Sequence, residues 1–137
     1  ANVTLIERSK IMHNLLQDGI SEAERFGGEI GKIISRMSLI FGDSKFILPD
    51  LFPEVILIDT MYKERKKTAL VKNDMRLVRE IVGSDPDYIE LINVALNQAS
   101  NRVVIKQPRY ADPINNVKPY SHQILGKTIR YDVYMKI

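Results

Sequence analysis

Residues 55–59 read VILID and decide the fold, because they form the clearest buried strand in the chain. Four consecutive aliphatic residues without a polar break are typical of a strand that is covered on both faces, as in a parallel sheet. Asp59 follows directly and is therefore expected at the carboxyl end of this strand. In open α/β sheets ligands gather at that end, so Asp59 is the first candidate for a functional side chain.

Strands and helices are predicted to alternate on both sides of this segment. Apolar runs predict further strands at 3–6, 38–41 and 103–105, and apolar residues recur at helical spacing over 11–20, 26–37, 75–82 and 89–99. Two alternating segments around Gly126-Lys127 predict a hairpin, and the three prolines of residues 107–119 predict a loop. This order predicts an α/β fold with a mostly parallel sheet and an antiparallel C-terminal hairpin.

A glycine-rich segment, Gly27-Gly28-Glu29-Ile30-Gly31, lies inside a helical pattern instead of directly after a strand. A dinucleotide-binding loop follows a strand and opens a helix. The segment is therefore predicted as a kink in a helix or a turn between two helices.

Composition narrows the class of protein. The chain has 137 residues, 45% of them hydrophobic, which suits one globular domain over residues 1–137. There is no cysteine, and His13 and His122 lack ligand-like spacing, so no metal site is expected.

No apolar run is long enough to span a bilayer and no signal peptide is recognisable, so we expect a cytoplasmic protein. The chain starts at Ala1 and enters a strand almost at once, as expected for an internal part of a longer protein.

Basic residues gather in two segments, one between residues 63 and 79 and the other between 102 and 130, and the formal net charge is +3. A run of charge is commonly a solvated face, but it also suits an anionic partner. Charge alone leaves both interpretations open.

Two acidic residues at predicted strand ends also have alternative roles. Glu7 could accept two hydrogen bonds from a ribose diol, or it could cap the helix that follows. Asp59 could accept hydrogen bonds from an exocyclic amine while Tyr62 stacks on an extruded base. Alternatively, Asp59 caps the next segment and Tyr62 packs on the surface.

Several segments together resemble one family, the bacterial small-subunit ribosomal RNA guanine-N2 methyltransferases (RsmJ). The resemblance is carried, in the family's order, by LIER at 5–8, LLQDG at 15–19, IDTMY at 58–62, KERKKTALVKNDM at 63–75, RVVIKQP at 102–108 and GKTIRYDVY at 126–134. It spans nearly the whole chain.

The resemblance implies a Rossmann-like class I methyltransferase fold, S-adenosylmethionine as the methyl donor, and ribosomal RNA of the small subunit as the partner. By position, Glu7 and Arg8 would contact the cofactor, with Glu7 at the ribose, and Asp43 would approach the adenine. Asp59 would lie beside both the methyl group and the target amine, as the catalytic residue and as a further cofactor-binding residue. The substrate-binding residues would be Met61 and Tyr62 at the base, with Arg65, Lys66, Lys67 and Lys106 toward the RNA.

The chain departs from the family at two points. Thr60 and Lys63 stand where the family has prolines. The family's first strand and Gly-rich cofactor loop are absent, so the strands ending at Glu7 and Asp59 are expected to expose unpaired backbone, and residues 1–137 alone are expected to be inactive. Two alternatives to the enzyme stay open: a non-catalytic RNA-binding remnant of the fold, and a methyltransferase of the same fold that acts on another nucleic acid or a small molecule.

Overall fold

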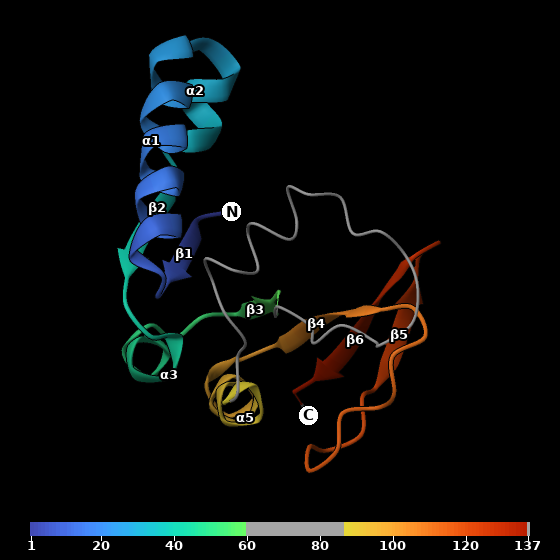
Figure 1. Ribbon diagram of the computed structural model, residues 1–137. Helices are drawn as coiled ribbons and strands as arrows, with labels where there is room; N and C mark the ends of the chain where they lie inside the picture. Colours follow the sequence, from blue (N-terminus) through green and yellow to red (C-terminus); the bar gives the residue numbers. More distant parts are fainter. Residues whose placement is uncertain (60–86, 137) are drawn as a thin grey trace.

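The computed structural model describes residues 1–59 and 87–136 (Figure 1). Within them the elements follow the predicted alternation of strands and helices, and the chain ends in an antiparallel hairpin. The helix predicted over 75–82 lies outside the described residues.

The N-terminal part is a parallel strand pair joined by two helices. Strand β1 (Val3–Glu7) pairs in register with β2 (Met37–Phe41), and α1 (Lys10–Phe26) and α2 (Gly28–Ile34) connect them. Ser9 caps α1, because its hydroxyl accepts a hydrogen bond from the Met12 amide at 3.4 Å. Gly27 and Gly28 have φ angles of 62° and 59° and separate the helices, so the predicted turn is confirmed.

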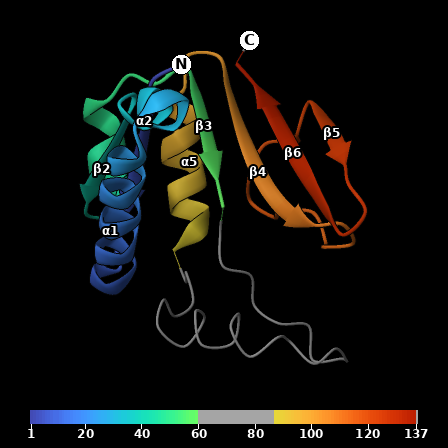
Figure 2. The ribbon, with the colours of Figure 1, turned by 90° about the horizontal axis from the view of Figure 1, so that it is seen from above.

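The C-terminal part is a four-stranded mixed sheet. Its strands lie in the order β3 (Val55–Ile58), β4 (Arg102–Pro108), β6 (Ile129–Met135) and β5 (His122–Leu125). Strands β3 and β4 are parallel, and β6 is antiparallel to both of its neighbours. In Figure 2 the arrowheads of β3 and β4 point to the same side of the molecule. The carboxyl ends of these two strands therefore share one edge of the sheet.

Helix α5 (Tyr88–Gln98) covers one face of this sheet and closes the core. Ile92 and Ala95 of the helix are fully buried against β3 and β4, where Ile56, Ile58 and Ile105 point inward. The short elements α3 (Ser44–Ile47) and η1 (Leu48–Asp50) link β2 to β3 and pack beside α5. This arrangement places β3 between the helical layer and the exposed opposite face, where Leu57 is 63% exposed.

Strand β4 is longer than the sequence indicated. A loop was predicted from residue 107, but Gln107 and Pro108 continue the strand opposite Arg130 and Ile129. The loop predicted from the prolines is correct from residue 109 onward. The end of β4 is set by its pairing with β6, which lies far along the chain, up to the pair Pro108 and Ile129.

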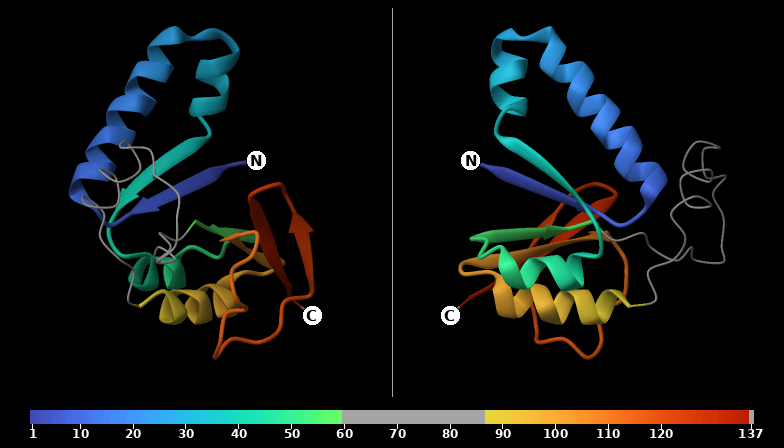
Figure 3. Two further views of the ribbon diagram at one scale, coloured as in Figure 1. Left: turned by 45° about the vertical axis from the view of Figure 1, so that its right-hand side comes forward. Right: turned by 90° about the vertical axis from the view of Figure 1, so that its left-hand side faces the viewer.

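Strands β1 and β3 face each other across the middle of the molecule without a shared ladder. In the described residues β1 is hydrogen-bonded to β2 and β3 to β4, and Figure 3 shows β1 on the side of its sheet nearer to β3. Within residues 1–59 and 87–136, β1 and β3 therefore each have one edge without a strand partner, as the sequence predicted. Part of the apolar stripe of α1 is also exposed, including Ile11 and Leu15.

Candidate active site

Glu7 lies at the carboxyl end of β1 and is half-buried. One carboxylate oxygen, Oε1, accepts a hydrogen bond from the Ser9 amide at 2.6 Å, and the Glu7 carbonyl accepts one from the Gly42 amide at 3.0 Å. Gly42 has a φ of 150°, and a side chain there would meet Ile47 Cδ1 at 2.8 Å, so this turn requires glycine. The ends of β1 and β2 are held together at the place where an acidic side chain is presented.

Asp43 follows that turn and caps α3. Its Oδ1 accepts a hydrogen bond from the Lys45 amide at 2.9 Å, and its Oδ2 lies 3.9 Å from Arg8 Nη1. The structure therefore brings together Arg8 and Asp43, two residues predicted to contact the cofactor.

Arg8 belongs to an ion-pair network that reaches the start of α5. Its Nη1 lies 3.2 Å from Asp87 Oδ1, and Lys45 Nζ lies 2.6 Å from Asp87 Oδ2 and 2.8 Å from Glu90. The hydrogen bond from Lys45, with help from Arg8, lowers the pKa of the Asp87 carboxyl below its usual range, and the same bond raises the pKa of Lys45. The network links the edge carrying Glu7 and Asp43 to the helix that covers β3.

Lys45, Asp87 and Glu90 were not predicted as site residues from the sequence. Lys45 lies four residues after the end of the strand predicted at 38–41, and that proximity was a usable signal. Nothing in the sequence indicated that Asp87, 42 positions further along, pairs with it, because the pairing depends on how α5 packs.

Asp59 and Lys106 form the second predicted group at this edge. The Lys106 Nζ lies 2.7 Å from Asp59 Oδ2, and the two side chains are 33% and 59% exposed, Lys106 being the less exposed. Exposed ion pairs of this kind contribute little net free energy, so either partner can exchange its contact for a substrate group. A carboxylate also has several acceptor positions, which lets Asp59 bind an amine while Lys106 remains in place.

The other predicted substrate-binding residues, Met61, Tyr62, Arg65, Lys66 and Lys67, lie outside the described residues. Their roles stay predictions. The effect of having Thr60 and Lys63 where the family has prolines also stays a prediction.

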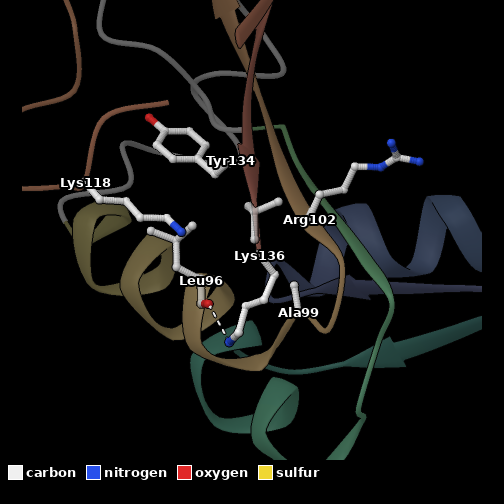
Figure 4. A pocket seen from close by; sticks show the side chains of 7 residues that line it. Leu96, Ala99, Arg102, Lys118, Tyr134 and Lys136 are labelled. Carbon is white, nitrogen blue, oxygen red and sulfur yellow. Dashed lines mark hydrogen bonds between the residues drawn. The ribbon is translucent and has the colours of Figure 1, made fainter. Parts of the chain in front are cut away.

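A small hollow at the opposite end of β4 has a structural explanation (Figure 4). Lys136 Nζ donates to the carbonyls of Leu96 and Asn97, at 3.4 and 3.0 Å, and so satisfies the last turn of α5. Lys118 Nζ donates to the Met135 carbonyl at 3.3 Å. Burial raises the pKa of the Tyr134 phenol beside them to about 12.

In residues 1–59 and 87–136 there is no cluster of three or more histidine or acidic side chains that could hold a metal ion. None of the helices described there is long and apolar enough to cross a membrane.

The alternation of parallel strands and helices, with acidic side chains at the carboxyl ends of β1 and β3, is that of a Rossmann-like protein. A crystal structure of a SAM-dependent methyltransferase from Neisseria gonorrhoeae superimposes on 98% of the chain with a TM-score of 0.74 and 29% sequence identity. The alignment covers 52% of that protein.

The sequence comparisons identify the family. A family described as "Putative SAM-dependent methyltransferase" matches residues 1–136, so the chain belongs to it. Ribosomal RNA small subunit methyltransferase J of Brucella anthropi is 53% identical over 99% of the chain, and the protein of the same name from Agrobacterium fabrum is 55% identical over 98%. The chain spans 66% and 65% of the lengths of these two relatives.

The described residues fit part of an S-adenosylmethionine site. Glu7 presents a carboxylate where ribose hydroxyls bind in sheets of this kind, and the Gly42-Asp43 turn lies directly beside it.

Proposed function

We propose that the protein containing this chain transfers a methyl group from S-adenosylmethionine to the exocyclic N2 amine of a guanine in small-subunit ribosomal RNA. The observation that carries the proposal is the Asp59–Lys106 pair at the shared carboxyl edge of β3 and β4. It is supported by the names of the relatives, which are ribosomal RNA small subunit methyltransferases. A cytoplasmic location belongs to the same proposal, because that is where this substrate is assembled.

In the proposed cofactor site, Glu7 accepts hydrogen bonds from the ribose. Asp43 approaches the adenine, and Arg8 contributes at the same edge by holding Asp43 in position. Because Arg8 also pairs with Asp87, its guanidinium is fixed from two sides. These residues bind and orient the cofactor.

At the reaction centre, Asp59 accepts a hydrogen bond from the target amine and directs the nitrogen lone pair. When bound, the cofactor would supply an electrophilic methyl group on its sulfonium sulfur, and loss of that methyl group would leave a neutral thioether. As the N–C bond forms, the nitrogen loses one proton, and the Asp59 carboxylate lies ready to accept it. Positioning supplies much of the acceleration in such a transfer.

Lys106 keeps the Asp59 carboxylate in place and adds positive charge next to the incoming RNA. Met61 and Tyr62 are proposed to contact the target base, and Arg65, Lys66 and Lys67 to contact the phosphates. These five assignments rest on the resemblance in sequence.

Labelled methyl transfer by the full-length protein to small ribosomal subunits tests the proposal, with nucleoside analysis of the product. The parent is expected to form N2-methylguanosine, whereas Asp59→Asn is expected to lose nearly all activity and keep its cofactor affinity. Asp50→Asn is the matched control, because Asp50 is an exposed aspartate that lies before the opposite end of β3. Full turnover by Asp59→Asn, or methylation at another atom, contradicts the proposal.

A further inference from the structure

Beyond Lys106, strand β4 continues to Pro108 and leads into Arg109 and Tyr110. Tyr110 is 75% exposed, and the guanidinium carbon of Arg109 lies 5.7 Å from the centre of its ring. Exposed rings beside a cation also occur at Phe41 and Phe46, but Tyr110 differs from them because it follows strand β4 and Lys106 directly in the chain. The proposed methyl transfer gives neither residue a role.

The backbone that carries this ring is tightly held. The Arg109 amide donates to the Thr128 carbonyl at 2.9 Å, and Arg109 Nη1 donates to the Gly126 carbonyl at 2.5 Å. In addition, Arg130 Nη1 donates to the carbonyls of Arg109 and Ala111, at 3.2 and 2.6 Å. Tyr110 thus lies between two anchored residues.

Arg130 is itself fixed by a buried ion pair. Its Nε and Nη2 donate to the two oxygens of Asp132 at 2.9 and 3.2 Å, and Gln123 Nε2 donates to Asp132 Oδ1 at 2.6 Å. Arg130 and Asp132 are 6% and 1% exposed. Burying two charges is costly unless the groups are paired, and here the paired Arg130 also donates to the backbone on both sides of Tyr110.

Tyr110 also follows Lys106 of the proposed reaction centre closely along the chain. Tyr110 follows Lys106 by four positions, and at about 3.3 Å per residue the two are at most about 13 Å apart along the chain. Lys106 and Arg109 belong to the same segment, and the exposed Lys127 follows Gly126, whose carbonyl accepts a hydrogen bond from Arg109; the exposed Asp112 adds one negative charge. An exposed aromatic ring within a cationic surface suits a nucleic acid, because a base stacks on the ring while its phosphates meet the cations.

We propose that Tyr110, supported by Arg109, is a stacking platform for an unpaired base that neighbours the target guanine, with Lys127 near the adjoining phosphate. The inference rests on the proposed function and deepens it: the substrate is RNA with unpaired nucleotides on both sides of the reaction. Stacking tolerates any base, so Tyr110 contributes affinity and register, while Asp59 and its pocket select the target.

Equilibrium RNA binding by the full-length protein tests the proposal with three variants. Tyr110→Leu is expected to weaken binding of an unpaired small-subunit RNA segment about tenfold, whereas Tyr110→Phe, which keeps the ring, should bind like the parent. The control is Tyr120→Leu, because Tyr120 is 39% exposed but precedes β5 at the other end of the hairpin, where Ser121 bonds to Val133. Its RNA affinity and the cofactor affinity of all three variants should not change.

A fluorescence measurement supplies an independent readout. The chain has no tryptophan, so Tyr110→Trp introduces an indole at the platform and Tyr120→Trp introduces one at the control position. Added RNA should quench the emission from position 110 and leave that from position 120 unchanged.

Each other outcome overturns the inference in a distinguishable way. If the parent methylates RNA and Tyr110→Leu binds as tightly as the parent, the platform is excluded and the proposed function stands. If Tyr110→Phe loses as much affinity as Tyr110→Leu, the hydroxyl rather than stacking is responsible. If Tyr110→Leu binds assembled subunits more weakly than the parent but binds naked RNA equally well, the ring contacts ribosomal protein instead of RNA. A parent that neither binds nor methylates RNA removes the proposed function as well.

Discussion

The ammonium of Lys106 donates a hydrogen bond to the carboxylate of Asp59 across 2.7 Å, joining the carboxyl ends of two parallel strands. The two residues are 47 positions apart in the chain, but they lie next to each other because β3 and β4 pair in register up to Ile58 and Ile105. We propose that Lys106 helps to orient the Asp59 carboxylate for the reaction.

Replacing Lys106 should therefore affect turnover more than stability. We expect Lys106→Met to lower kcat for methyl transfer at least tenfold, because Asp59 loses its orienting partner. The free energy of unfolding should change by less than about 1 kcal/mol, since the pair is exposed. Lys118→Met, at the other end of the sheet, serves as the control; equal kcat for both variants would contradict this role for Lys106.

Loss of the Glu7 carboxylate should weaken cofactor binding. Glu7→Ala is expected to cost about 1.5–3 kcal/mol in S-adenosylmethionine affinity, because charge-assisted hydrogen bonds to the ribose are removed. Calorimetric titration of the full-length protein measures this, with the exposed Glu29→Ala as control. Unchanged affinity would remove Glu7 from the cofactor site.

The pKa of Asp87 predicts how its ion pairs respond to acid. Because the folded-state pKa is lowered, the stabilisation is fully present above the unfolded value of about 4 and is lost as the pH falls through the lower folded value. The difference in melting temperature between the parent and Asp87→Asn should thus be constant near pH 7 and shrink below about pH 4. High salt should reduce it, since the groups are partly exposed. A difference that grows on acidification would contradict the assignment.

Breaking the buried Arg130–Asp132 pair should destabilise the fold strongly. Arg130→Met leaves Asp132 charged and buried, which costs about 3–5 kcal/mol in the free energy of unfolding. The double variant Arg130→Met/Asp132→Leu should recover a large part of that loss. Urea denaturation provides the comparison, and a double variant as unstable as the single one would show that the charge is not the cause.

The basic segment after Asp59 is expected to bind phosphates without reading sequence. Neutralising Arg65, Lys66 and Lys67 together should weaken RNA binding across sequences and flatten its dependence on salt, by about 0.7 in the logarithmic slope for each phosphate that is no longer bound. The matched control neutralises Arg25, Lys32 and Arg36, three exposed cations near α2. If the RNA affinity of the parent and of the 65–67 variant is the same at every salt concentration, this segment contributes to solubility and does not bind RNA.

Local pattern alone was enough to predict most of the elements. Aliphatic runs marked β1, β2 and β3, Ser9 marked the start of α1, and the residues around Gly126 marked the final hairpin. These features depend on residues close together in the chain, where periodicity and capping act directly. For the same reason Glu7, Asp43 and Asp59 could be placed at strand ends, and those positions are confirmed.

Contacts between distant segments were decided by the tertiary structure. Only the packing of α5 brings Asp87 to Arg8 and Lys45, and only pairing with β6 extends β4 to Pro108 and anchors Arg109 and Tyr110 beyond it. Such contacts depend on which strand finds which neighbour, and no local pattern records that choice. The sequence by itself therefore determined where the acidic residues of the site stand, whereas the three-dimensional arrangement determined their partners.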